Sequence, residues 1–250
     1  MKLLILSDIH SNIECLRAIW ENEGGADLIA AAGDYVDYGT DPRAVLDWMR
    51  SHDVLGVRGN HDDRVIDLWR KGDYADAPSM EFGWAHHNCM RLRESDIADL
   101  DALPYSRCFQ ADGIAYLMAH RCGNGYETIE SQYHFDRFWA EHFDLPGCEG
   151  MERRMIFGHT HRQMAVRLEN GLWINPGSAS YRRPDDPDKT AHYAVIEAGN
   201  IRFERVPYDR RPLYEEAVRW RSRMNPGEWH VADFFFGWRE EDGPDIPRQD

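Results

Sequence analysis

Short apolar runs alternate with amphipathic segments over the first 60 residues of the chain. The runs KLLILS (2–7), DLIAAAGD (27–34) and VLGVRG (54–59) predict short buried strands. Between them, SNIECLRAIWEN (11–22) has apolar residues at helical spacing, and DPRAVLDWMRSH (41–52) opens with an Asp-Pro helix start. This alternation predicts βαβαβ units and therefore a parallel sheet in an α/β fold.

Helical patterns dominate the middle of the chain and return near its end. Residues 62–103 favour helix, with a polar interruption at KGDYADAPS (71–79). YHFDRFWAEHF (133–143) predicts an aromatic amphipathic helix whose rings serve packing rather than ligand binding. RRPLYEEAVRWRSRM (210–224) predicts a terminal helix, and residues 240–250 predict a frayed tail.

Strand-like runs are frequent in the second half of the chain. Two of them, SRCFQ (106–110) and IAYLMA (114–119), interrupt the helical middle. From residue 155 we expect a second sheet of largely antiparallel strands, because short apolar runs are separated there by turn signals. These runs are MIFG (155–158), MAVRL (164–168), LWIN (172–175), HYAVIEA (192–198) and IRFERV (201–206).

The chain of 250 residues is long enough for one large domain or two small ones. Its 42% hydrophobic content suffices for a buried core, and no linker demands a second domain. We therefore expect a single domain over 1–250, in which 72–150 is a mostly helical insert or cap and 211–250 is a C-terminal helix and tail.

Charge and cysteine content narrow the possible binding partners and the expected location of the protein. A formal net charge of −15 argues against a nucleic acid as partner, although bound divalent cations would still admit a small phosphate ester. The five cysteines contain no CxxC pair and indicate reduced thiols. The N-terminal apolar run is too short for a signal peptide, and no run suffices for a membrane span. We expect a cytoplasmic protein without membrane contact, and the sequence leaves its oligomeric state open.

Candidate metal ligands follow five of the apolar runs. Because ligands of open α/β sheets bind beyond the carboxyl ends of the strands, these side chains are expected to converge on one rim. A single polar residue after a strand is commonly structural, but five such positions in one chain favour a shared site. The candidates are Asp8, His10, Asp34, Asn60, His120, His159 and His161.

The candidate ligands form a nitrogen–oxygen set without cysteine. Such a set suits Mn, Fe, Zn, Ni or Co better than a thiolate metal or a calcium cage. Seven ligands exceed a single tetrahedral site and fit two divalent transition-metal ions that share a carboxylate, with manganese favoured. Such a pair supplies hydroxide at neutral pH and clamps phosphoryl oxygens.

The order of the motifs resembles that of the calcineurin-like metallophosphoesterases, in particular their small bacterial and archaeal phosphodiesterase and phosphatase branch. The matching motifs are D-x-H (8–10), G-D-x-x-D (33–37), G-N-H-D (59–62), His120, G-H-T-H (158–161) and NPGSASYRR (175–183). The resemblance implies a four-layer α-β-β-α sandwich of two mixed sheets, with a dimetal site at the carboxyl ends of the strands. It implies a first metal held by Asp8, His10 and His161, a second held by Asn60, His120 and His159, and a bridging Asp34.

The resemblance also implies roles beside the metals. His61 would face the leaving-group oxygen as a proton donor or electrostatic partner, and Asp37 would orient it. Asp62 is favoured as a helix N-cap or supporting group rather than a ligand. Tyr38 stands where the protein Ser/Thr phosphatases and the diadenosine tetraphosphate hydrolases of the superfamily carry a phosphate-binding arginine, which speaks against both of those activities.

For several residues near the motifs, the sequence leaves more than one interpretation open. Asn12 either contacts a substrate phosphate or caps the following helix. Arg64 and Arg121 either neutralise phosphate, lie at the surface or support the site residues. His86 and His87 favour packing or exposure on a helix, and residues 175–178 favour a structural turn. The run FFFGW (234–238) favours tertiary packing, with a dimer contact or a lid as the alternative.

The sequence therefore predicts a metal-dependent phosphoesterase, with a phosphodiesterase on a small or nucleotide-like substrate favoured. A dimetal-bridged hydroxide would attack phosphorus while His61 assists the leaving group. Within the same chemistry, a phosphomonoesterase or a dinucleotide polyphosphate hydrolase remains an alternative. From another class, the alternatives are a catalytically silent metal-binding scaffold and a nucleotide sensor.

Overall fold

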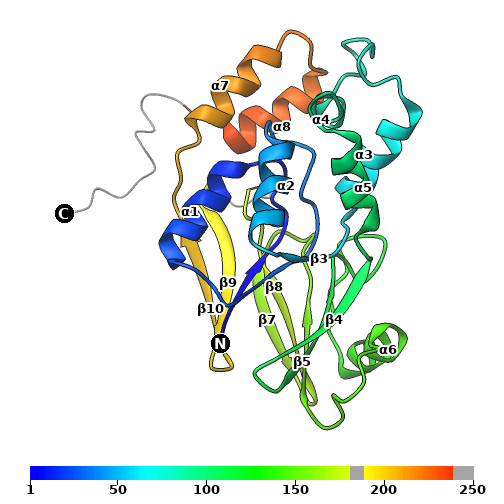
Figure 1. The fold of residues 1–250 in the computed structure, drawn as a ribbon, viewed down its shortest axis with the longest axis vertical. Coiled ribbons are helices and arrows are strands. Elements are labelled where there is room, and N and C mark those ends of the chain that lie inside the picture. Colours follow the sequence, from blue (N-terminus) through cyan, green and yellow to red (C-terminus); the bar gives the residue numbers. More distant parts are fainter. Residues whose placement is uncertain (181–188, 239–250) are drawn as a thin grey trace, which may run out of the picture.

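The computed structural model describes residues 1–180 and 189–238. In this part of the chain, ten strands form two five-stranded sheets, and helices cover the outer face of each sheet (Figure 1). The apolar cluster between the sheets draws residues from both, including Ile5, Ala194, Tyr116 and Ile174. The predicted four-layer α-β-β-α sandwich is confirmed.

The first sheet has the strand order β10-β9-β1-β2-β3. Three of its strands are parallel, namely β1 (Lys2–Leu6), β2 (Leu28–Ala31) and β3 (Leu55–Gly56). They are connected by α1 (Ile13–Glu23) and α2 (Pro42–Ser51), as the alternating pattern predicts. Strands β9 (Ala191–Glu197) and β10 (Asn200–Val206) form a hairpin that pairs antiparallel to β1.

Alternate residues of β1 face the two layers of the core. Leu4 and Leu6 pack with the helices, whereas Leu3 and Ile5 pack with the second sheet. Because both faces of the strand are covered, each of these positions is apolar, and the strand reads as an unbroken apolar run. Burial on both faces also fixes its register, which places Asp8 beyond its carboxyl end.

The second sheet has the strand order β4-β5-β6-β8-β7. Its strands are β4 (Ser106–Ala111), β5 (Ile114–Ala119), β6 (Glu152–Ile156), β7 (Gln163–Leu168) and β8 (Gly171–Pro176). Pairs β5–β6 and β6–β8 are parallel, and the two outer pairs are antiparallel. Helix α6 (Gln132–His142) covers the outer face through Phe135, Phe138 and Trp139 (Figure 1).

Two expectations about the second half of the chain need correction. The strands after residue 155 do not make one largely antiparallel sheet, because β9 and β10 join the first sheet. Strand β9 is buried along almost its whole length, so it requires a central place with both faces covered. The range 72–150 is helical only in part, since β4 and β5 within it belong to the second sheet.

Helices from distant parts of the chain gather beside the first sheet. α3 (Asn60–Lys71), α4 (Trp84–Arg91) and α5 (Glu94–Ala102) are followed much later by α7 (Arg211–Trp220) and α8 (Pro226–Phe236). In Figure 1, α7 and α8 lie next to α4. An apolar cluster that includes Trp84, Leu213 and Phe236 joins these three helices.

Helix α8 was not predicted from the sequence. It contains most of the FFFGW run, and Phe235 and Phe236 are buried, which agrees with a packing role for that run. The predicted tail at 240–250 and residues 181–183 of the NPGSASYRR motif lie outside the described residues. Within the described chain, no helix combines the length and apolarity needed to cross a membrane.

Candidate dimetal centre

Two groups of candidate metal ligands lie beyond the carboxyl ends of the strands. In each group, one potential ligand atom from every side chain lies within 4.8 Å of the others. The first group contains Asp8, His10 and His161, and the second contains Asp34, His120 and His159. Strands β1, β2, β5 and β6 deliver them to one rim because they end there side by side. The structure thus brings together residues from four motifs spread over about 150 positions.

Asp34 lies between the two groups. Its Oδ2 atom is 3.1 Å from Nε2 of His120 in the second group and 4.0 Å from Nε2 of His10 in the first. Asn60 lies on the side of the second group, since its Oδ1 is 3.1 Å from Nε2 of His120. This arrangement suits the expected roles of Asp34 as a bridge and Asn60 as a ligand.

The backbone at the candidate ligands is strained. Positive φ angles between 48° and 63° occur at Asp8, His10, Asp34, His159 and His161. A non-glycine residue in this left-handed region costs about 1–3 kcal/mol, and such residues cluster at functional sites. The surrounding fold stabilises a conformation that turns these side chains inward.

Glycines let the ligand-bearing turns approach closely. A Cβ atom at Gly59 would collide with Oδ1 of Asp34, and one at Gly158 would collide with Oγ of Ser7. At the same turn, the backbone N–H of His159 donates to Oδ2 of Asp8 at 3.1 Å. The glycine in each of these motifs is therefore a packing requirement of the site.

Two buried carboxylate oxygens support the fit of metal ions to these residues. Oδ1 of Asp8 and Oδ2 of Asp34 accept no hydrogen bond of good geometry from any described residue, and their nearest partners are Nε2 of His161 at 3.0 Å and Nε2 of His120 at 3.1 Å. Both side chains are at most 1% exposed, so bulk water does not solvate these two oxygens. An uncompensated buried carboxylate is costly, and metal coordination is one of the usual ways of satisfying it. Together with the imidazoles, these oxygens form a donor set suited to transition metals.

The histidines present the nitrogens that coordination requires. Nδ1 of His120 donates to the carbonyl of Ala32 at 2.7 Å, which leaves Nε2 as the nitrogen that faces Asp34 and Asn60. Burial disfavours the charge of this ring, but Asp34 outweighs burial and raises the pKa of His120 to about 9, so a metal ion would displace a proton from Nε2. Burial is the main cause that lowers the pKa of His10 and of His159 to about 4, so both rings are neutral at pH 7. For Asp8, burial opposes ionisation, but His161 and other neighbours outweigh it and lower the pKa to about 2.

His61 has a different environment from the candidate ligands. Its Nδ1 lies 2.8 Å from Oδ2 of Asp37, and its ring lies 4.9 Å from that of His10 and 4.7 Å from that of Tyr38. Burial disfavours its charge, but Asp34 and Asp37 outweigh burial and raise its pKa to about 9. His61 is therefore a protonated group at neutral pH, held beside the first ligand group.

Asp62 supports the site through the backbone. Its carboxylate accepts from the amides of Gly59 and Asp34 at 2.9 and 3.0 Å, and also from those of Tyr35 and Val36. These bonds tie the start of α3 to the loop after β2. Asp62 is thus a capping and supporting group, one of the interpretations that the sequence favours for it.

Asn12 caps helix α1. Its Oδ1 accepts from the amide of Cys15, and its Nδ2 donates to Ser180 and Tyr208. The side chain is fully buried and its polar atoms are bonded within the protein, which favours the helix-cap interpretation over contact with a substrate phosphate.

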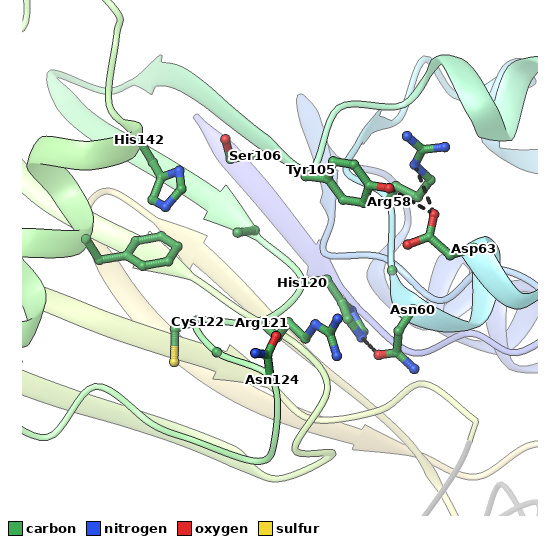
Figure 2. Close-up of a pocket in the computed structure, with 14 residues that line it drawn as sticks. Arg58, Asn60, Asp63, Tyr105, Ser106, His120, Arg121, Cys122, Asn124 and His142 are labelled. Atoms are coloured by element: carbon green, nitrogen blue, oxygen red, sulfur yellow. Dashed lines mark hydrogen bonds and ion pairs between the residues drawn. The ribbon is translucent and has the colours of Figure 1, made fainter.

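Two arginines near the ligands differ in their pairing. The guanidinium of Arg64 lies 3.0 Å from Asp37 and 2.9 Å from Glu228. Arg121, by contrast, forms no hydrogen bond or ion pair with any residue that the structure describes. It lines a pocket that opens next to Asn60 and His120 (Figure 2).

Three residues of the site were missed in the sequence. Asn88 of α4 accepts from the backbone N–H of Asp37 at 2.9 Å, and Tyr126 stacks on His159 with 4.8 Å between ring centroids. Glu228 of α8 contacts Arg64. None of the three follows a strand or belongs to a motif, so only the tertiary structure reveals them.

Two groups of candidate nitrogen–oxygen ligands lie at the rim of a four-layer sandwich, and Asp34 lies within 4.0 Å of a histidine of each group. Such an arrangement is typical of binuclear metallohydrolases. The chain belongs to the calcineurin-like phosphoesterase superfamily, whose domain model matches residues 1–200. The enzymes of this superfamily are hydrolases that act on phosphoester bonds.

Individual proteins from archaea and bacteria are similar to this chain over nearly its whole length. The uncharacterized protein MJ0912 of Methanocaldococcus jannaschii is 24% identical over 94% of this chain and 98% of its own. The crystal structure of a metallophosphoesterase from Sphaerobacter thermophilus is similar with a TM-score of 0.70 at 23% identity, covering 93% of this chain and 100% of that one. Hypothetical protein PH1004 from Pyrococcus horikoshii has the same TM-score at 15% identity, with 95% and 99% covered. At these identities, the two structures establish the shared fold.

Proposed function

We propose that the protein is a metal-dependent phosphodiesterase acting on a small or nucleotide-like phosphate ester. The observation that carries this proposal is the position of protonated His61 beside two ligand groups that share Asp34. Asp8, His10 and His161 would hold one divalent ion, and His120, His159 and Asn60 the other. When bound, such ions, for which we favour manganese, supply an activated water and neutralise phosphoryl charge.

Residues of the chain would then protonate the leaving group and hold the proton donor in place. Asp37 holds Nδ1 of His61 at 2.8 Å, so that the opposite ring nitrogen, Nε2, can present a proton to the departing alkoxide. Arg64 contacts the same oxygen of Asp37 and so restrains this carboxylate from a second direction. The five free thiols support a reducing, cytoplasmic setting.

The test is the hydrolysis of bis-p-nitrophenyl phosphate and of p-nitrophenyl phosphate by metal-stripped protein. Mn, Ni, Zn or Mg is added back separately, and the two esters are compared at equal protein concentration. Turnover of the diester that requires added metal supports the proposal, and a preference for the monoester would replace it with a phosphomonoesterase. Metal binding without turnover of either ester or of a nucleotide panel would favour a silent scaffold or a sensor.

A further inference from the structure

A pocket of about 280 Å³ opens beside the second ligand group (Figure 2). Asn60, His120 and Arg121 are among the residues that line it, so a molecule in the pocket lies against the candidate site. The volume lies near the lower end of the usual range for ligand pockets, which suits one ring system rather than a polymer. The proposed phosphodiesterase activity gives this pocket no role so far.

Flat surfaces form two walls of the pocket. On one wall the guanidinium of Arg58 stacks over the ring of Tyr105 at 4.5 Å, and Tyr105 is 61% exposed. On another wall Phe138 and His142 of α6 lie with ring centroids 4.3 Å apart. Figure 2 shows Tyr105 and His142 on different sides of the space. Aromatic rings and guanidinium planes of this kind bind the faces of planar groups.

Polar groups of the pocket match the remaining parts of such a ligand. The amide of Asn124 and the hydroxyl of Ser106 offer hydrogen bonds to ring edges or sugar hydroxyls. Arg121, which has no charged partner among the described residues, offers a cation next to Asn60. A guanidinium suits a phosphate in geometry and charge. The pocket thus offers flat surfaces for a ring, hydrogen-bonding groups for its edges and a cation for a phosphate. These contacts together suit a nucleotide.

The position of the pocket distinguishes the two substituents of a diester. Asn60 and His61 are successive residues at the start of α3, yet Asn60 contacts His120 of the second group and His61 lies against His10 of the first. The pocket therefore lies beside the second ligand group, whereas His61 lies beside the first. A phosphate bound between the groups can direct one ester group to His61 and the other into the pocket.

We infer that this pocket binds the nucleoside that stays on the phosphate while the other ester group leaves beside His61. The inference rests on the proposed function for the position of the phosphate. It names the substrate class as a nucleoside phosphodiester, with Tyr105 as a specificity residue and Arg121 as a phosphate contact.

The test uses two substrates with the same leaving group, thymidine 5′-(p-nitrophenyl phosphate) and methyl p-nitrophenyl phosphate. The metal-loaded protein should prefer the nucleoside ester, and Tyr105→Ala should lower kcat/KM for that ester about tenfold without affecting the methyl ester. Tyr105→Phe keeps the wall and should keep the preference. Tyr133→Ala, which removes a similarly exposed tyrosine of α6, should change neither rate. Equal rates for the two esters in the wild type, or an equal loss of both in Tyr105→Ala, would overturn the inference.

A binding measurement separates this inference from the proposed function. Calorimetry with thymidine 5′-monophosphate and with inorganic phosphate does not require turnover. We expect the nucleotide to bind about tenfold more tightly than phosphate and to lose this advantage in Tyr105→Ala. If neither ester is hydrolysed but the nucleotide advantage is observed, the proposed function fails and the pocket stands. If the esters are hydrolysed and the two anions bind equally, the pocket inference fails alone.

Discussion

The carboxylate of Glu228 lies 2.9 Å from the guanidinium of Arg64 and thereby connects helix α8 to the candidate dimetal centre. Arg64 in turn lies 3.0 Å from the oxygen of Asp37 that holds His61 at 2.8 Å. Glu228 also accepts from the backbone N–H of Trp84. A helix beyond the matched family domain is thus part of the support of His61.

Replacement of Glu228 by Gln should reduce kcat for bis-p-nitrophenyl phosphate about fivefold and leave KM and metal content unchanged. The reason is that Arg64 loses one of its two carboxylate partners and restrains Asp37 less well, and small displacements of catalytic groups are costly. Glu215→Gln, on the exposed face of α7, is the matched control. A loss of metal with the activity would show that Glu228 acts on the ligands instead.

Replacement of Asp37 by Asn should shift the alkaline limb of the pH–rate profile to lower pH. His61 must carry a proton to act as an acid, so activity falls as the pH rises through its pKa. Asp37 helps to raise this pKa to about 9 against the effect of burial, and the amide lacks that charge. The profile of kcat between pH 6 and 10 measures the shift. In a His61→Ala background the same substitution should move no limb, and a shift there would assign the limb to another group.

Metal binding should stabilise the protein through Asp34. Adding Mn²⁺ to metal-stripped protein should raise the thermal midpoint, because an ion that binds only the native state stabilises it by about 2.7 kcal/mol at 100 times its Kd. Asp34→Asn should abolish most of this increase, since it removes the carboxylate that we propose is shared by both ions. Asp67→Asn changes an exposed carboxylate of α3 and should retain it. Equal midpoints with and without the ion in the wild type would contradict coordination at this site.

Acid should destabilise the protein in part through His87. This ring is buried between Trp84 and Trp220 and accepts from Arg91, and burial followed by Arg91 lowers its pKa to about 3. Below pH 6.5 the His87 ring binds a proton in the unfolded chain, whereas in the native state it stays neutral until the pH approaches 3. The free energy of unfolding therefore falls as the pH drops from 6.5 towards 3, by about 1.4 kcal/mol per unit from this group.

Urea unfolding of His87→Gln at pH 6.5 and pH 5 measures this contribution. The variant should lose about 2 kcal/mol less than the wild type over this interval. His134→Gln, on an exposed position of α6, should behave like the wild type. An equal pH dependence in wild type and His87→Gln would place the acid sensitivity elsewhere.

The fold was predictable where local pattern alone decides it. The parallel strands before Asp8 and Asp34 are continuous apolar runs, and each polar residue after them is visible in the sequence. Their meeting at one rim follows from the parallel topology, which the alternation of strand and helix reveals.

Contacts that depend on tertiary packing were not predictable in the same way. The hairpin of β9 and β10 pairs with β1, about 190 positions earlier, and the register of that pairing leaves no local signal. Asn88 and Glu228 reach Asp37 and Arg64 from helices α4 and α8, and no motif in either helix marks these side chains. The alternatives for Asn12 likewise required the positions of Ser180 and Tyr208 before its amide could be assigned to packing.

The most direct test of the central claim compares bis-p-nitrophenyl phosphate hydrolysis by wild type and His61→Ala at equal, measured metal content. His61 belongs to neither ligand group, so the variant should retain two ions per chain. We predict that its kcat falls by about 10²–10⁴-fold, the usual effect of removing a general acid. An unchanged rate at full metal occupancy would contradict the role of His61 and with it the mechanism proposed here.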